Sequence, residues 1–154
     1  MKLMNKLKER RANNKGFSLV ELIIVIAIMA ILVGIVGTQV VPYLNRSKES
    51  KDLQLINSYS TAAMTACSTY AEKMPSGDFT VDVYGTATAD SFEALVQAEI
   101  KKLTGYDQLT DLTQKMTSTA KDSITGIKVT YDANKKQLTT EAVGTDLDKV
   151  IADM

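Results

Sequence analysis

The stretch KGFSLVELIIVIAI, residues 15–28, decides the fold because it opens a long apolar segment. No residue from Leu22 to Leu44 carries a charge. A helix needs about 20 apolar residues to cross a bilayer, so this segment is long enough to span one. Residues 1–16 contain six basic side chains and one acid. The positive-inside rule therefore places that end in the cytoplasm and everything after Leu44 outside.

Glu21 is the only charged residue between Phe17 and Leu44. An acid at the centre of a membrane helix costs about 2.5 to 3.5 kcal/mol on insertion scales, and less near an end. Two interpretations follow from the residues alone. Either Glu21 marks the interfacial edge of the span, or it meets a positive partner.

These residues resemble the prepilin signal of type IV pilins and of type II secretion pseudopilins. A basic leader, a glycine, a phenylalanine and then a glutamate four residues on follow one another in order. The resemblance is close from Lys15 to Pro42 and only architectural beyond. It implies that a membrane prepilin peptidase cleaves between Gly16 and Phe17 and methylates the new amino terminus at Phe17.

The resemblance also gives Glu21 a positive partner, namely the Phe17 amine of a neighbouring subunit. An unpaired charge inside an apolar filament core is heavily penalised. The pair would therefore admit only subunits that have been cleaved and that lie in the correct register.

A polar helical pattern continues the apolar segment. Apolar or small residues recur at steps of three and four, which keeps them on one stripe of a helix: Leu53, Ile56, Ser60, Ala63, Cys67, Tyr70 and Met74. The pattern predicts one helix from about Phe17 to Met74, with Cys67 buried as a free thiol and Asp52 off the stripe. The sequence PSGD, residues 75–78, ends it.

Gly34, Gly37 and Pro42 lie where the apolar segment ends. Membrane helices tolerate glycine and proline, so one interpretation gives these residues no special role. The resemblance implies another, in which this segment unwinds on assembly and lets the filament stretch. Many pilins have their proline four residues earlier, where this chain has Thr38.

The remaining residues predict a small head. Apolar and polar side chains alternate, as they do in β-strands, in residues 79–84, 127–131 and 137–143. The last two segments predict a hairpin whose turn is formed by residues 132–136. Asp90 and Glu93 indicate a capping box for a helix through Leu103, which Gly105 closes. Residues 107–120 predict a loop with a helical turn. The tail from Thr145 predicts a short helix with Asp148 at its start.

The predicted fold class is α+β. A long amino-terminal helix, transmembrane and then amphipathic, carries a small antiparallel sheet, which is the lollipop-shaped pilin fold. Four parts are expected: a cleaved basic leader (1–16), the transmembrane or filament-core half of the helix (17–44), its amphipathic half (45–74) and a globular head (75–154).

The composition argues against catalysis. The chain has no histidine and one cysteine, so catalytic triads and the usual zinc sites lack their residues. The 18 basic and 18 acidic side chains balance, which gives no basic surface for nucleic acid. Asp146, Asp148 and Asp153 match no calcium loop. We expect no enzyme, no catalytic residue, no cofactor and no metal.

The resemblance implies a structural subunit of an extracellular type IV pilus that serves adhesion, surface motility, biofilm formation or DNA uptake. The expected partners are further copies in a helical filament, the prepilin peptidase, an inner-membrane assembly platform with its ATPase, and DNA or a host surface. The chain would cross the cell membrane once before assembly. The alternatives are a type II secretion or competence pseudopilin and a membrane-anchored extracellular binding protein.

Overall fold

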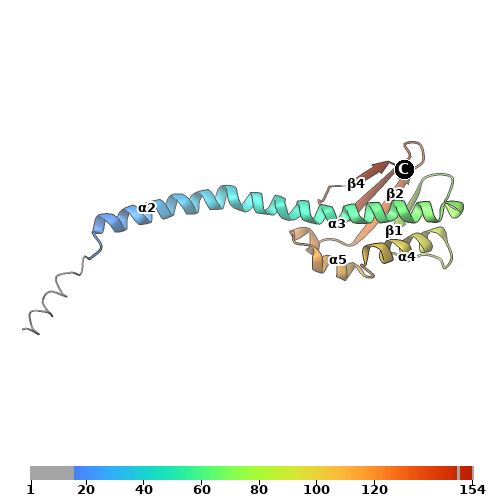
Figure 1. Cartoon of the computed structure of the whole chain (residues 1–154), viewed down its shortest axis with the longest axis horizontal. Helices are drawn as coiled ribbons and strands as arrows, with labels where there is room; N and C mark the ends of the chain where they lie inside the picture. The colour runs from blue at the N-terminus through green and yellow to red at the C-terminus, as the bar shows by residue number, and fades with distance from the viewer. Residues whose placement is uncertain (1–15, 149, 154) are drawn as a thin grey trace, which may run out of the picture. The chain divides into compact units, whose positions relative to one another are not determined.

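The computed structural model describes residues 16–148 and 150–153 (Figure 1). Residues 1–15, which make up most of the predicted basic leader, lie outside the described residues. Contacts divide the chain into two units, residues 1–43 and 44–154. Each unit is described by itself.

The first unit is helical from Leu19 onward. Helix α2 (Leu19–Ile35) passes into a five-residue π-helix, η1 (Val36–Val40), and then into α3 (Val41–Thr69). The helical residues from Leu19 to Thr69 include a stretch long and apolar enough to cross a membrane. Every residue from 16 to 43 is exposed, and aliphatic side chains surround the helix on all sides. A helix apolar all round requires an apolar environment.

The sheet of the second unit has four antiparallel strands in the order β1-β2-β3-β4. They are β1 (Phe79–Asp82), β2 (Gly126–Asp132), β3 (Gln137–Val143) and β4 (Val150–Asp153). Alternate residues of β3 are buried, namely Leu138, Thr140 and Ala142, as expected for a sheet with one covered face. The predicted hairpin is confirmed, and the first strand is two residues shorter than expected.

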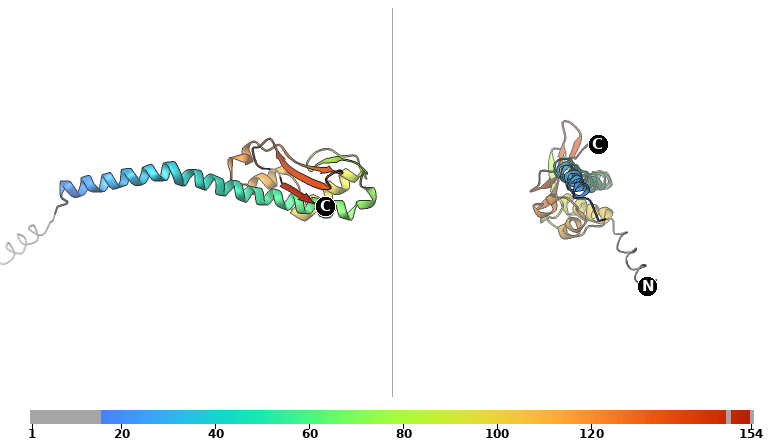
Figure 2. Two further views of the ribbon diagram at one scale, coloured as in Figure 1. Left: turned by 90° about the horizontal axis from the view of Figure 1, so that it is seen from above. Right: turned by 90° about the vertical axis from the view of Figure 1, so that its left-hand side faces the viewer.

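The covered face packs on α3. The buried cluster joins Ile56 and Tyr59 of α3 to Val81, Val129 and Leu138 of the sheet. Both views of the ribbon place the red and orange strands along the green part of α3 (Figure 2). Cys67 is fully buried in this cluster, as predicted, and burial raises the pKa of its thiol to about 11.

Three shorter helical segments lie between β1 and β2: α4 (Phe92–Thr104), α5 (Leu109–Lys115) and the 3-10 turn η3 (Thr119–Asp122). Gly105 closes α4 in the left-handed conformation, with φ of 75°, as expected. The N-cap prediction was wrong by one residue. Ser91 caps α4 by accepting from Ala94 N–H at 3.1 Å, whereas Asp90 has a φ of 62° outside the helix.

The prediction of a short helix in the tail was wrong. Residues 150–153 form β4, which pairs with β3 in a register that places Ile151 opposite Thr139. A helix of one or two turns barely forms in isolation because nucleation is costly. The outer edge of β3 offers a row of backbone partners instead. The fold class is nevertheless the one expected: α+β, with a long amino-terminal helix and a small antiparallel sheet.

Two predictions made from the amphipathic pattern of the long helix were wrong, one at its carboxyl end and one at Asp52. The α-helix ends at Thr69 and a 3-10 turn, η2 (Ala71–Lys73), follows, so regular α-helix stops before the predicted Met74. Asp52, which the pattern placed off the stripe, is fully buried.

Candidate processing and assembly site

The backbone around Gly16 and Phe17 lies outside any helix or strand. Phe17 is 90% exposed, and Ser18 is extended before the helix begins at Leu19. The peptide bond between Gly16 and Phe17 is therefore free of helical hydrogen bonds. A peptidase needs such an extended and accessible bond.

Gly16 itself is not required by the fold. A Cβ added at this position would meet no heavy atom within 4 Å, and the residue shows no left-handed backbone conformation. Packing among the described residues therefore places no demand for glycine at this position.

Ser18 and Glu21 form a capping box at the start of α2. Val20 N–H donates to Ser18 Oγ at 3.3 Å, and Ser18 N–H donates to Glu21 Oε2 at 2.9 Å. The carboxylate also lies at the positive end of the helix dipole. The acid is thus partly satisfied within a single uncut copy.

Sequence reasoning missed Ser18 as part of this site. The signal was present, since Ser-x-x-Glu ahead of an apolar run is the pattern of a capping box. The same rule was used at Asp90. In the described residues Glu21 bonds to Ser18 and not to Phe17, so its pairing with a Phe17 amine of another copy stays a prediction.

Gly34, Gly37 and Pro42 lie within the π-helix η1 or close to its ends. Gly34 lies in the last turn of α2, Gly37 within η1, and Pro42 at the second residue of α3. Val41 N–H donates to the Val36 carbonyl, which is the five-residue spacing of a π-helix. The helix thus changes its hydrogen-bond pattern here without losing helical conformation.

Asp52 is a second residue that the sequence did not reveal. Its carboxylate accepts from the N–H groups of Thr117 and Ser118 at 2.8 and 2.9 Å, and from both hydroxyls as well. Four donors compensate for the removal of the charge from water. Asp52 thereby ties the segment after α5 to α3.

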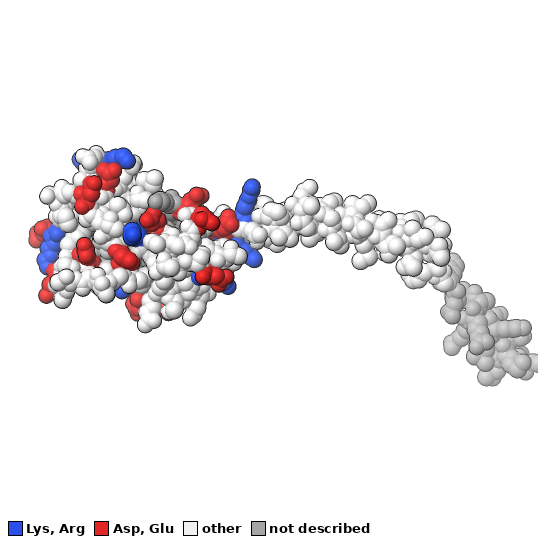
Figure 3. All heavy atoms as spheres, turned by 180° about the vertical axis from the view of Figure 1, so that it is seen from behind, with Lys and Arg blue, Asp and Glu red and all other residues white. Residues whose placement is uncertain are grey.

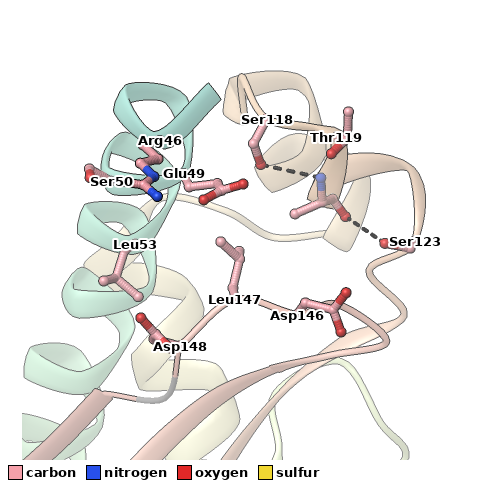
Figure 4. Close-up of a pocket in the computed structure, with 11 residues that line it drawn as sticks. Arg46, Glu49, Ser50, Leu53, Ser118, Thr119, Ser123, Asp146, Leu147 and Asp148 are labelled. Atoms are coloured by element: carbon pink, nitrogen blue, oxygen red, sulfur yellow. Dashed lines mark hydrogen bonds between the residues drawn. The ribbon is translucent and has the colours of Figure 1, made fainter. Parts of the chain in front are cut away.

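A cavity of about 570 Å³ opens beside this segment (Figure 4). The side chains of Arg46 and Glu49 come to it from α3, and those of Asp146, Leu147 and Asp148 from the loop before β4. Leu147 points into its middle. No group of three or more histidine, cysteine or acidic side chains suited to a metal occurs among the described residues.

The surfaces of the two units differ in charge. The visible face of the apolar segment of unit 1 is white, whereas both signs of charge are interspersed over unit 2 (Figure 3). Two ion pairs among the described residues join neighbours in sequence, Lys102 with Glu99 and Lys135 with Asp132. The second unit therefore presents a mixed, solvated surface.

Comparison with known protein families gives one match. Residues 11–37 match the prokaryotic N-terminal methylation motif. No curated protein and no solved structure matches the chain. The matched residues cover the non-helical segment at Gly16 and Phe17, the capping box, and the helix as far as η1.

Proposed function

Because the chain carries the type IV prepilin signal at residues 11–37, we propose that it is a structural subunit of an extracellular type IV pilus. The motif is that of type IV pilin and pseudopilin-like precursors, which are structural and not catalytic. The observation that carries the proposal is that this motif leads into a helix whose apolar side chains are all exposed.

No other described residue of the same chain packs on the apolar side chains of this helix, so lipid or another protein must shield them from water. Lipid shields them before assembly, and the long apolar segment fits insertion in a membrane. Lipid tails are as apolar as leucine, so association between such helices depends on close packing and polar contacts. Copies of the same helix meet that requirement in a filament.

Processing supplies the contact that selects the copies. The prepilin peptidase cleaves after Gly16 and methylates Phe17, which creates a cationic amine where an amide stood. Glu21 then exchanges its neutral Ser18 N–H donor for the amine of a neighbouring subunit. Hydrogen bonds between charged partners are roughly twice as strong as neutral ones, so the exchange favours assembly.

The same proposal assigns the parts of the chain. Residues 1–16 are the removed leader, residues 17–44 the membrane and then filament-core helix, residues 45–74 the amphipathic helix, and residues 75–154 the exposed head. Removal of the leader takes away a net charge of about +5 and leaves the mature chain acidic.

Assembly would also change the helix near η1. Gly34, Gly37 and Pro42 weaken the backbone in this segment, since glycine and proline are the poorest helix formers. The π-helical hydrogen bonds are a further weak point. Unwinding at residues 34–42 would let the filament stretch.

The expected partners follow from this life cycle: the peptidase, an inner-membrane assembly platform, its ATPase, and further copies of the chain. The chain begins as a single-pass membrane protein with its amino terminus in the cytoplasm and ends in a filament outside the cell. The mature filament serves adhesion, motility, biofilm formation or DNA uptake through its heads.

Two measurements test the proposal. Mass spectrometry of the mature protein should find N-methylated Phe17 as its first residue. Negative-stain microscopy of material sheared from cells should show long filaments that contain this chain. An intact Met1 together with an absence of filaments would indicate a membrane-anchored binding protein. Short structures confined to the cell envelope would indicate a pseudopilin.

A further inference from the structure

The long helix is exposed at every described residue before Asp52. All residues from 16 to 51 are exposed, whereas Asp52 has 0% relative exposure and is the first buried residue of the described helix. Ile56 and Tyr59 follow it in the buried cluster of the second unit. Within the described chain, burial therefore holds the helix only from Asp52 onward.

The turns just before Asp52 depend mainly on local helical hydrogen bonds. Residues 43–51, YLNRSKESK, include one asparagine and two serines, which favour caps and turns over the interior of a helix. The cavity of about 570 Å³ lies beside Arg46, Glu49 and Ser50 (Figure 4), so this face of the helix is not closely packed. Short helices without tertiary packing are marginal in water. These turns therefore offer little resistance to unwinding.

The carboxylate of Asp52 resists unwinding in a way that the earlier residues do not. It accepts from the N–H groups of Thr117 and Ser118 at 2.8 and 2.9 Å, and from both hydroxyls. Unwinding at residue 52 changes the direction of its side chain, because the direction of the Cβ is set by the helical backbone. The carboxylate would then lose its donors, and a buried charge without donors is heavily penalised.

The donors of Asp52 are themselves fixed in the second unit. Met116, the residue before them, is 4% exposed, and its N–H donates to the Leu112 carbonyl at 3.2 Å. On the other side, the Ser118 hydroxyl accepts from Ala120 N–H at 3.2 Å. A pull on the helix is thus passed through Asp52 to the buried core of the second unit.

We infer that Asp52 is the residue at which unwinding of the helix stops in the filament, an inference that rests on the proposed filament function. In the proposed assembly, unwinding occurs in residues 34–42. Tension carries it on through residues 43–51, whose side chains are all exposed. It ends at the first buried side chain, because four hydrogen bonds join that side chain to the second unit.

A stop at Asp52 sets how far each chain can lengthen. A residue advances 1.5 Å along a helix and about 3.4 Å in an extended chain. Residues 34–42 alone therefore lengthen by about 17 Å when extended, and residues 34–51 by about 34 Å. The stop also protects the second unit, because α3 remains helical from Ile56 onward and keeps its buried contacts.

The first test measures hydrogen exchange of backbone amides in wild-type filaments. Exchange reports local opening of the helix. We expect amides of residues 43–51 to exchange roughly tenfold faster, or more, than those of residues 53–66, with the step at Asp52. Equal protection on both sides of Asp52 would overturn the inference, because neighbouring copies would then hold the earlier turns.

Asp52→Asn should move this step along the helix. The amide presents an NH₂ group to donors that need an acceptor, and the next fully buried side chain is that of Ile56. Exchange of residues 53–55 should therefore rise roughly tenfold relative to residues 59–66 of the same helix. A general loss of stability would raise both segments equally. An equal rise, or no rise, would overturn the inference.

Glu49→Gln is the matched control. It makes the same chemical change within one turn of Asp52, but at an exposed acid. The step in exchange should stay at Asp52 in this variant. A step displaced as far as in Asp52→Asn would contradict the inference, because it would show that the loss of any acid in this part of α3 has the same effect.

Thr117→Val weakens the same contact from its other side and serves where Asp52→Asn chains do not assemble. It removes one hydroxyl donor, at 3.3 Å, and keeps both backbone donors. Loss of one hydrogen bond corresponds to about a two- to tenfold change in an equilibrium constant. Exchange of residues 53–55 relative to residues 59–66 should rise within that range, and an unchanged ratio would overturn the inference.

Proteolysis under tension locates the stop directly. Filaments attached to beads are stretched in flow with chymotrypsin, which cuts unwound chains after aromatic residues and leucine. Cuts are expected after Tyr43 and Leu44 but not after Leu53 or Leu55, whereas Asp52→Asn should add the latter two. Wild-type filaments that are cut at all four positions, or at none, overturn the inference alone. Wild-type chains that form no filaments overturn the proposed function.

Discussion

At the scale of single residues, the proposed function gives Glu21 two partners at two stages. In the described chain it holds the N–H of Ser18 at 2.9 Å, which reduces the penalty of an acid in an apolar helix. In the proposed filament it holds the amine of Phe17 from another copy. The proposed cleavage after Gly16 would separate the two stages, because only a cut chain carries that amine.

Replacing Glu21 should separate insertion from assembly. Glu21→Ala keeps the apolar segment, so we expect membrane insertion and cleavage at wild-type levels, measured by immunoblot of membranes. Filament yield after shearing should fall at least tenfold, because the contact that selects copies is gone. Ser18→Ala is the matched control; it removes a helix cap worth about 1 kcal/mol but keeps the acid, and filaments should still form. Normal numbers of Glu21→Ala filaments would refute the role given to this acid.

Gly16 gives a prediction about processing alone. Since the fold leaves open space at this residue, Gly16→Ala and Gly16→Val should fold and insert like wild type. The rate of leader removal, followed by pulse-chase, should fall slightly for Gly16→Ala and at least tenfold for Gly16→Val. Wild-type cleavage of Gly16→Val would show that the cut lies elsewhere.

At the scale of secondary-structure elements, Asp52 joins α3 to the segment between α5 and η3. Its four hydrogen bonds come from Thr117 and Ser118, and the Ser118 hydroxyl in turn accepts from Ala120 N–H at 3.2 Å. One buried carboxylate thereby orders the start of η3. The wall of the open cavity beside η3 depends on the same residue.

Asp52→Asn should destabilise the second unit. The amide presents an NH₂ group to donors that need an acceptor, and an unsatisfied buried donor costs about 1 to 3 kcal/mol. For a unit of this size we expect a melting temperature lower by about 5 to 15 °C, measured on the full chain in detergent. Glu72→Gln, at an exposed acid of η2, is the control and should melt like wild type.

At the scale of the whole molecule, the second unit is held together by tyrosines far apart in sequence. Tyr59 of α3 bonds through its hydroxyl to that of Tyr84, which follows β1, and Tyr84 Oη donates to the Tyr106 carbonyl at 3.2 Å. The rings of Tyr59 and Tyr106 stack with centroids 6.1 Å apart. Burial is the main cause that raises the pKa of Tyr59 and of Tyr84.

These shifts predict a loss of stability in alkali. The folded state keeps both phenols protonated, whereas the unfolded chain releases their protons near the ordinary pKa of about 10. The contribution of the two tyrosines is therefore complete below about pH 10 and is lost as the pH rises above it. Chemical denaturation between pH 8 and pH 11 should show unfolding free energy falling above pH 10, and less steeply in Tyr59→Phe. A flat profile across that range would contradict the assignment.

The chain alone was sufficient to predict the parts that depend on local pattern. The apolar segment, the motif at residues 15–21, the hairpin around residues 132–136 and the buried position of Cys67 all follow from charge, spacing and turn chemistry, which neighbours in sequence supply. The capping box at Ser18 belongs with them, although it was overlooked.

Only the tertiary structure decided the rest. Residues 150–153 became a strand because β3 presented an unpaired edge, and Asp52 became buried because Thr117 and Ser118 bring four donors to it from more than sixty positions away. Such partners are chosen by contact in space, where hydrogen bonds and burial outweigh the weak local preferences that a sequence pattern expresses.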